Sequence, residues 1–152
     1  MIFPARRCEL PNDRTDTYIN AIKSTVSNDP GMQLVVTLFP TLRDDRYAAV
    51  KKVLCYELPC ASQCINTKTL RNENKNRSIV LKILLQMNCK LGGTLWALKI
   101  PLQSTMIVGI DTYHEGANRG KTVGGLVASI NASFTRYYSR PHIQESAKEE
   151  LV

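Results

Sequence analysis

The 152-residue chain lacks a long apolar run. A membrane span requires about 18 consecutive apolar residues, and no segment reaches that length. Near the beginning, Arg6 and Arg7 are not followed by the apolar segment of a signal peptide. We therefore expect neither a membrane-spanning helix nor a secretory leader.

Glycine-rich phosphate-binding motifs are absent as well. No G-x-G-x-x-G or Walker sequence follows a strand-like segment, and the pair Gly124 and Gly125 lies inside a strand-like run instead. This disfavours a Rossmann domain that binds a small nucleotide. No internal repeat is present, and only residues 66–77 are biased in composition, toward Asn and charged residues.

The cysteines number five and include no Cys-x-x-Cys pair. An odd set without that spacing argues against a disulfide framework and against a zinc site. Cys60 and Cys64 come nearest to a ligand pair, but no histidine stands at a matching spacing. We expect a reduced, intracellular protein that binds no zinc and whose thiols are buried or half-buried.

Positive charge is in excess, with 20 Lys and Arg against 13 Asp and Glu and a formal net charge of +7. This balance favours a polyanionic partner such as a nucleic acid. One Trp, six Tyr and three Phe supply some rings for base stacking. With 43% hydrophobic residues, the chain can bury one core, as expected for one globular domain or a domain joined to part of another.

Hydrophobic periodicity in the first two thirds of the chain predicts alternating helices and strands. The expected elements are a helix over 16–27, a strand over 34–39, a helix from 44 to near 59, a strand over 63–65, a polar loop over 66–77 and a helix over 78–90. Gly92 and Gly93 end the last helix. This order predicts an α/β fold with a Rossmann-like parallel sheet and flanking helices.

The pattern changes after Gly93. Strand-like runs follow over 95–100, 106–111, 123–130 and 134–139. The last two are typical of a meander or hairpin. We place a domain boundary between residues 103 and 104, which gives domains over 1–103 and 104–152. The closing residues 144–152 predict the beginning of a helix.

Helical spacing gathers polar side chains on two of the expected helices. Tyr47 and Lys51 are four residues apart, and the helix over 78–90 carries a polar stripe opposite an apolar one. The polar stripe consists of Lys82, Gln86 and Lys90, and the apolar stripe, expected to face the sheet, of Ile79, Ile83, Leu84 and Met87. Any amphipathic helix presents such a solvated stripe. In combination with Gln63 on the intervening strand, however, these phenol, amide and ammonium groups suit a terminal phosphate.

Four motifs, DDRYAAVKKVLC, SQCIN, KILLQMNCKLGG and MIVGIDTYH, resemble those of Piwi-clade argonaute proteins. The resemblance extends over residues 32–140, and its most specific stretches are NCKLGG with the Leu-Trp that follows and GID-x-YH. It implies that the Rossmann-like sheet belongs to a MID domain. The first strands of a ribonuclease H-like PIWI domain, here incomplete, would follow.

The resemblance implies a site for the 5′ phosphate of a guide RNA, formed by Tyr47, Lys51, Gln63, Gln86 and Lys90. Tyr47 would also stack on the first base. Many argonautes outside the Piwi clade have lysine at the position of Gln86, and the resemblance implies that a divalent metal such as Mg²⁺, bound in part by this amide, compensates.

The resemblance also implies a loop that senses the first nucleotide and often favours uridine. This loop would consist of Thr41, Leu42, Arg43, Asp44, Asp45 and Arg46. A plain strand-to-helix turn is the alternative interpretation.

Asp111 matches the first carboxylate of the catalytic set in argonaute PIWI domains, where two divalent ions such as Mg²⁺ activate water and stabilise the leaving oxygen. One carboxylate cannot hold two metal ions, so the chain alone is not expected to cleave RNA. An ordinary aspartate at the end of a strand is the alternative interpretation. His114 is expected to be a structural residue.

The resemblance therefore implies binding of a small single-stranded guide, a piRNA, in RNA-mediated silencing of genes and transposons in the germline. Target RNA would be a partner of the full-length protein, and the expected location is the cytoplasm, in perinuclear granules, or the nucleus. Two alternatives stay open. The chain could be part of a guide-directed RNA endonuclease, or a protein-interaction module whose basic face is only solvated, which RNA binding independent of the 5′ phosphate would favour.

Overall fold

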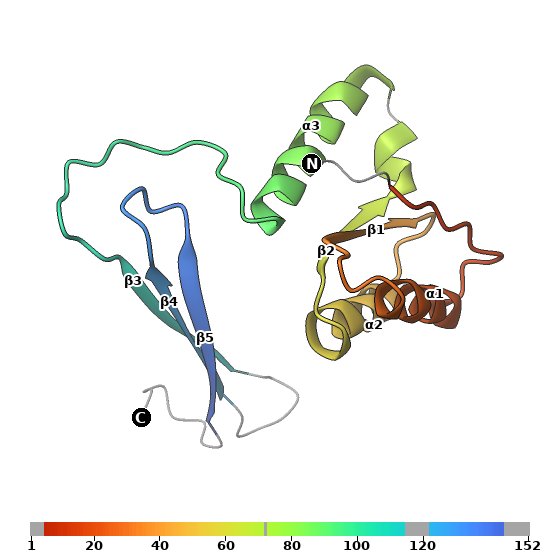
Figure 1. Cartoon of the computed structure of the whole chain (residues 1–152), viewed down its shortest axis with the longest axis horizontal. Coiled ribbons are helices and arrows are strands. Elements are labelled where there is room, and N and C mark those ends of the chain that lie inside the picture. The colour runs from red at the N-terminus through yellow and green to blue at the C-terminus, as the bar shows by residue number, and fades with distance from the viewer. Residues whose placement is uncertain (1–4, 72, 115–121, 145–152) are drawn as a thin grey trace. The chain divides into compact units, whose positions relative to one another are not determined.

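A computed structural model describes residues 5–71, 73–114 and 122–144 of the chain. The chain forms two compact units, Met1–Gly93 and Thr94–Val152, and each unit has its own sheet (Figure 1). The domain boundary between residues 103 and 104 stays a prediction. None of the helices that the structure describes is long and apolar enough to cross a membrane.

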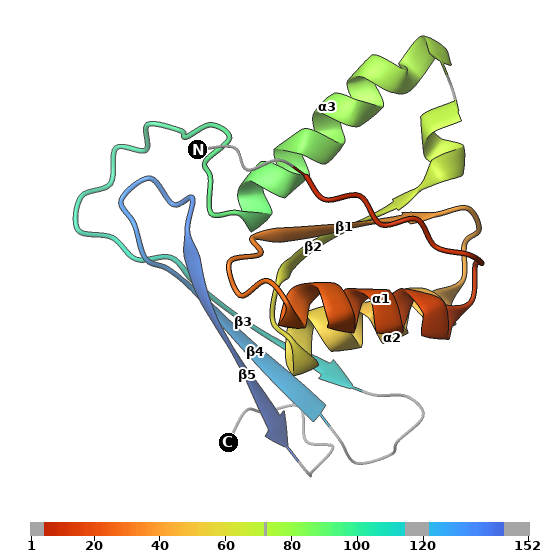
Figure 2. The same cartoon turned by 45° about the vertical axis from the view of Figure 1, so that its right-hand side comes forward.

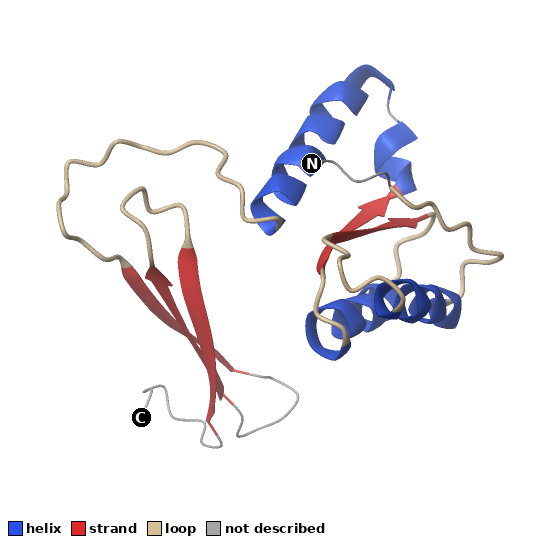
Figure 3. Cartoon of the chain, in the orientation of Figure 1, coloured by secondary structure: helices blue, strands red, loops and turns tan. Residues whose placement is uncertain are grey.

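The first unit has the predicted alternation of helices and strands (Figure 3). Its elements are α1 (Thr15–Ser27), β1 (Leu34–Phe39), α2 (Asp44–Lys52), a π-helical turn (Val53–Glu57), β2 (Ala61–Asn66), a 3₁₀ turn (Thr67–Arg71) and α3 (Glu73–Lys90). β1 and β2 pair in parallel, with Leu34 opposite Ala61 and Phe39 opposite Asn66. Helices α1 and α2 lie on one side of these strands and α3 lies on the other (Figures 1 and 2). The prediction of a parallel sheet with flanking helices is confirmed for this small sheet.

The core of the first unit lies between the sheet and the pair α1 and α2. Tyr18 and Ile22 of α1 are four residues apart, which places both on one face of the helix. The ring of Tyr18 packs edge-on against that of Phe39, with 5.2 Å between centroids. Val50 and Leu54 are the most deeply buried apolar residues, and full burial of such a side chain contributes about 1.5–3 kcal/mol.

Helix α3 begins earlier than predicted, at Glu73 rather than Ser78. The segment 66–77, predicted to be a loop, contains the 3₁₀ turn and the first turn of α3 instead. Lys and Arg have good helix propensity, and an acidic residue is favourable in a first turn, so a solvated helix start needs no apolar residue. The predicted apolar stripe is wrong at Leu84, which is 54% exposed.

The second unit is an antiparallel meander. Its strands are β3 (Val108–His114), β4 (Thr122–Ser129) and β5 (Tyr137–Gln144), and they pair in the order β3-β4-β5. This confirms the predicted meander. The strand predicted over 95–100 is wrong, because within the described residues this segment pairs with no strand, and Trp96 is 70% exposed. An apolar run becomes a strand only when its backbone groups find partners. The helix predicted after residue 144 lies outside the described residues.

Gly92 follows α3 with a backbone φ of +83°, a conformation that side chains with a Cβ rarely adopt. A Cβ at this position would meet no atom within 4 Å, so the cost of a substitution comes from the backbone alone. We expect Gly92→Ala to lower the free energy of unfolding of the first unit by about 1 kcal/mol, measured by urea denaturation. Gly31→Ala, where no positive φ opposes a side chain, is the control and should change it by less than about 0.5 kcal/mol. If both substitutions lowered the free energy of unfolding equally, the positive φ at Gly92 would not explain the cost.

Candidate functional site

The residues predicted to bind a phosphate come from α2, β2 and α3 of the first unit. Helix α2 begins with Asp44 and Asp45, whose carboxylates favour the positive end of the helix dipole. One turn of this helix then separates Tyr47 from Lys51, and Lys51 Nζ lies 5.8 Å from the centroid of the Tyr47 ring. Tyr47 is 50% exposed, which leaves its ring accessible.

Both lysines donate hydrogen bonds to the same residue of β2. Lys51 Nζ lies 2.8 Å from Ser62 Oγ and 3.3 Å from the Ser62 carbonyl oxygen. Lys90 Nζ lies 2.7 Å from that carbonyl oxygen and 2.7 Å from Gln63 Oε1. Two ammonium groups, from helices on opposite sides of the sheet, therefore converge on one carbonyl oxygen.

The amides of Gln63 and Gln86 extend this network. Gln63 is buried, accepts the bond from Lys90 and donates from Nε2 to Gln86 Oε1 at 3.2 Å. One side chain on β2 therefore links a lysine to an amide that lies one turn earlier on α3. We call Tyr47, Lys51, Ser62, Gln63, Gln86 and Lys90 the Ser62 cluster.

The two ammonium groups of the Ser62 cluster repel each other. Burial lowers the pKa of Lys90, and the nearby positive charge of Lys51 lowers it further. A depressed lysine pKa means that the surroundings disfavour the charged form. A bound anion would offset both effects, because its negative charge favours the charged form of each lysine.

All five predicted residues are brought together, and Ser62 is an addition that sequence reasoning missed. Its position beside Gln63 was the only available signal, because the role of a backbone carbonyl depends on the pairing of β1 with β2. Lys82, on the predicted polar stripe, is exposed, and its side chain forms no hydrogen bond or ion pair within the part of the chain that the structure describes. The polar stripe thus takes part in the cluster only at its C-terminal end.

The predicted first-nucleotide loop divides into two parts. Thr41, Leu42 and Arg43 connect β1 to α2, whereas Asp44, Asp45 and Arg46 form the first turn of α2. Leu42 is 82% exposed, and Arg43 forms an exposed ion pair with Asp45 at 2.6 Å. These side chains are accessible to a ligand.

Arg46 is different, because its side chain is fully buried. Its guanidinium group forms an ion pair with Asp13 and donates to the carbonyl oxygen of Thr41. It also lies over the rings of Tyr18 and Phe39, 5.3 and 4.7 Å from their centroids. A direct contact between Arg46 and a nucleotide therefore does not fit the structure, and this part of the loop prediction needs correction.

Asp111 and His114 both lie on β3 of the second unit. The prediction placed Asp111 at the end of a strand, but it lies in the middle of β3. Its Oδ1 accepts a hydrogen bond from the backbone N–H of Thr112 at 2.8 Å. His114 Nδ1 lies 2.9 Å from Thr122 Oγ1 on the paired strand. That contact agrees with a structural role for His114.

A metal site is not formed by the described side chains. Within residues 5–71, 73–114 and 122–144, no group of three or more His, Cys, Asp or Glu residues could hold a metal ion. In the Ser62 cluster, Gln86 Oε1 already accepts from Gln63, and the other charged groups are ammonium groups, which repel a cation. These residues alone do not fit Mg²⁺, which prefers several oxygen ligands.

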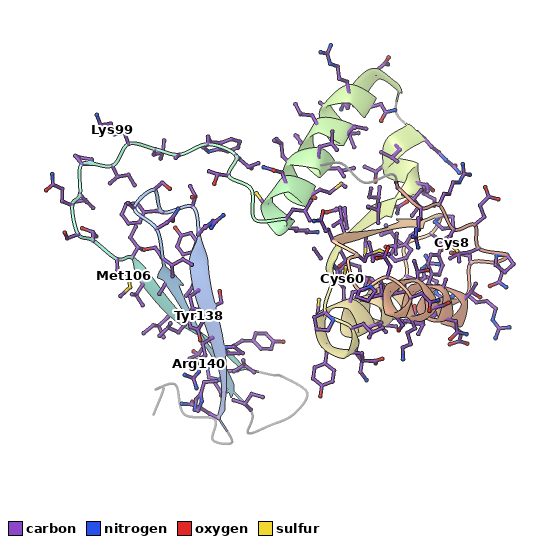
Figure 4. All side chains as sticks on the ribbon, viewed as in Figure 1. Cys8, Cys60, Lys99, Met106, Tyr138 and Arg140 are labelled. Atoms are coloured by element: carbon purple, nitrogen blue, oxygen red, sulfur yellow. The ribbon has the colours of Figure 1, made fainter. Side chains whose placement is uncertain are left out.

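The cysteines differ in exposure. Cys60 and Cys64 are half-buried as predicted; Cys60 is labelled in Figure 4. Cys60 Sγ lies 3.5 Å from the carbonyl oxygen of Met32. Burial raises the pKa of the Cys60 thiol, which makes the reactive thiolate scarcer. The prediction of buried or half-buried thiols is wrong for three exposed residues, Cys8, Cys55 and Cys89.

Comparisons with solved structures show the same fold. The crystal structure of Drosophila Piwi matches with a TM-score of 0.78 and 33% sequence identity, over 87% of this chain and 18% of that one. The structure of Kluyveromyces polysporus Argonaute with a guide RNA matches with a TM-score of 0.76 over 88% of this chain and 17% of that one. At 18% identity, the second match shows the fold alone.

Comparisons of sequence define the family. The model of the Piwi domain matches residues 34–152, and the chain therefore belongs to the Piwi family of argonaute proteins. It is 53% identical over 149 residues to Piwi-like protein Ago3 of Bombyx mori and 51% identical over 143 residues to protein argonaute-3 of Drosophila melanogaster. These alignments cover 98% and 94% of this chain but 16% of each relative. The chain thus spans about a sixth of the length of these relatives.

Proposed function

We propose that this chain binds the 5′-phosphorylated end of a single-stranded guide RNA through the Ser62 cluster. The convergence of two ammonium groups on the Ser62 carbonyl oxygen carries the proposal. Lys51 and Lys90 each donate two hydrogen bonds within the cluster, and an ammonium group has three donors. One donor on each lysine therefore remains for a phosphate oxygen.

The exposed ring of Tyr47 explains why the ligand would be a nucleotide rather than inorganic phosphate. Tyr47 stands one turn from Lys51, so a base attached to the bound phosphate can stack on it. Stacking of a base on an aromatic side chain contributes about 1–3 kcal/mol. The exposed segment Thr41–Arg43 precedes Tyr47 in the chain and is available to contact the edge of that base.

A longer protein containing this chain would act in piRNA-guided silencing of transposons, with target RNA as its second nucleic-acid partner. The solved Kluyveromyces polysporus Argonaute contains a guide RNA, which supports a guide at the level of the shared fold. On this proposal, residues 1–103 form a MID domain and residues 104–152 begin a ribonuclease H-like PIWI domain. The protein would work in cytoplasmic perinuclear granules or in the nucleus.

The described residues do not form a metal site by themselves, so any metal ion in this proposal needs further ligands from elsewhere. Mg²⁺ beside Gln86 would need further oxygen ligands from the RNA phosphate and from elsewhere in a longer protein. Asp111 would contribute one carboxylate to a catalytic metal site in a complete PIWI domain. The phosphate-binding step proposed here depends on neither ion.

The decisive experiment compares two short RNAs that differ only in a 5′ phosphate or a 5′ hydroxyl. Binding of the purified chain is measured at fixed moderate salt by fluorescence anisotropy, with Mg²⁺ and with EDTA. We expect tighter binding of the phosphorylated RNA in both conditions. Equal affinity for the two RNAs would reject the proposal and favour a protein-interaction module with a solvated basic face. A phosphate preference that appears only with Mg²⁺ would reject the metal-independent site.

Ser62→Ala tests the network directly. The change removes the hydroxyl that accepts from Lys51 at 2.8 Å but leaves the backbone carbonyl in place. We expect affinity for 5′-phosphorylated RNA to fall by about 1 kcal/mol, since Lys51 becomes less well positioned, with little change for 5′-hydroxyl RNA. Ser78→Ala on α3 is the control, because the Ser78 hydroxyl donates to the local backbone carbonyl of Lys75 and lies outside the Ser62 cluster. An equal loss of affinity in Ser62→Ala and Ser78→Ala would show that Ser62 does not contribute to phosphate binding.

A further inference from the structure

Asp13 lies before α1, outside the residues that match the Piwi domain, yet its carboxylate binds the start of α2. Oδ1 accepts from the Tyr18 hydroxyl at 3.0 Å and forms the ion pair with Arg46. Oδ2 accepts from Thr41 Oγ1 at 2.9 Å. The backbone carbonyl of Asp13 accepts a further bond from Arg46 Nη1 at 3.1 Å.

Asn12 holds Asp13 in place from the other side. Its Oδ1 accepts from the backbone N–H of Arg14 at 3.1 Å and from Thr17 Oγ1 at 2.7 Å. These bonds connect the segment before α1 to the first turn of that helix. Asp13 is thus fixed with respect to α1, rather than being part of a loose lead-in.

Arg46 connects Asp13 to the predicted first-nucleotide loop. Its second amino group, Nη2, donates to both the carbonyl and the hydroxyl oxygen of Thr41. The hydrogen bond that Arg46 donates to Asp13, with a further contribution from Thr41, lowers the pKa of Asp13, so the carboxylate is ionised at neutral pH. Asp13 and Arg46 together fix Thr41 at the beginning of the loop, and Arg46 immediately precedes Tyr47 in the first turns of α2.

We propose that Asp13 is a positioning residue for the first nucleotide of the guide. This inference depends on the proposed function of the Ser62 cluster and adds a residue that is not in that cluster. Asp13 acts through Arg46 and Thr41, keeping Thr41–Arg43 and the ring of Tyr47 in the place where the first base stacks. The lysine contacts to the phosphate do not involve Asp13, so the base contact and the phosphate contact are separable.

The test uses Asp13→Asn, which keeps the shape of the side chain but removes its charge. Asp16→Asn is the matched control, since Asp16 stands three residues later, is 82% exposed and pairs with Arg14 only at 4.0 Å. Each variant is titrated with three RNAs: a 5′-phosphorylated RNA beginning with uridine, the same RNA with an abasic first nucleotide, and the 5′-hydroxyl RNA. Hydrogen exchange of the backbone amides of residues 41–47 is measured without RNA.

For Asp13→Asn we expect the affinity ratio of uridine to abasic RNA to fall about tenfold, while the ratio of 5′-phosphate to 5′-hydroxyl RNA stays within about twofold. Exchange of the Tyr47 amide, which donates to the Arg43 carbonyl oxygen at 3.1 Å, should become at least about tenfold faster, since the ion pair that holds this segment is lost. Asp16→Asn should change none of these.

Three results would overturn the inference: an unchanged uridine-to-abasic ratio in Asp13→Asn, an equal loss of both ratios, or the same behaviour in both variants. Failure of the proposed function is distinguishable, because it shows as a missing 5′-phosphate preference in the unaltered chain. The exchange measurement needs no RNA and would still reveal whether Asp13 holds the loop.

Discussion

Arg46→Ala is expected to lower the free energy of unfolding of the first unit by about 2–4 kcal/mol. The guanidinium group is fully buried, so its removal deletes its bonds to Asp13 and Thr41 and its packing over the rings of Tyr18 and Phe39. Breaking a buried pair by removing one partner costs about 3–5 kcal/mol. Asp13 is 34% exposed and can regain water, which is why the expected loss extends below that range.

Urea denaturation followed by circular dichroism measures this loss. Arg43→Ala is the matched control, because Arg43 pairs with Asp45 at the surface. Its loss should change the free energy of unfolding by less than about 0.5 kcal/mol. A similar small effect in both variants would contradict a structural role for Arg46.

Acid should weaken the same contact in the unaltered chain. The pKa of Asp13 is lowered in the folded state, so its ionised form is stabilising at pH values above its ordinary pKa of 3.8. This contribution is lost as the pH falls through the lowered pKa. Arg46→Ala should lack this part of the acid sensitivity.

Lys90→Ala is expected to weaken binding of 5′-phosphorylated RNA by about 1.5–3 kcal/mol, the range for a charged hydrogen bond, and to leave 5′-hydroxyl RNA nearly unchanged. Lys90 donates to Ser62 and Gln63, so its loss also frees the Gln63 amide that reaches Gln86. Lys51→Ala should have an effect of the same size, since Lys51 converges on the same carbonyl oxygen.

Fluorescence anisotropy at one salt concentration measures the effect, and Lys82→Ala is the control. Lys82 belongs to the same helix and carries the same charge, but it is not part of the Ser62 cluster and lies two turns before Lys90. Its removal reports only the long-range effect of net charge, which salt screens. If Lys82→Ala and Lys90→Ala weaken both RNAs equally, the basic surface rather than a phosphate site explains the binding.

Local sequence signals were sufficient where an element has a clear period and clear ends. The spacing of Tyr18 and Ile22 predicted α1, and the apolar run between Gly31 and Pro40 predicted β1 at its observed bounds. Tyr47 and Lys51 share a face of α2 for the same reason. The resemblance to Piwi-clade argonautes selected the five predicted residues of the Ser62 cluster, and the structure brings them together.

Contacts that depend on tertiary pairing could not be predicted in this way. The strand expected over 95–100 fails because a strand requires a neighbour, which periodicity does not reveal. The Ser62 carbonyl oxygen becomes an acceptor for two lysines only when β2 lies between α2 and α3. Asp13 and Arg46 are 33 residues apart, and nothing in either segment indicates that they meet.

The shared carbonyl oxygen of Ser62 has a consequence for the speed and strength of ligand capture. A free lysine side chain loses rotamer entropy worth about 2 kcal/mol when a ligand immobilises it. Lys51 and Lys90 are already held by Ser62 and Gln63, so most of that entropy is lost during folding rather than during binding. On the proposed function, the site would therefore be preorganised, and a phosphate would meet donors that need little rearrangement.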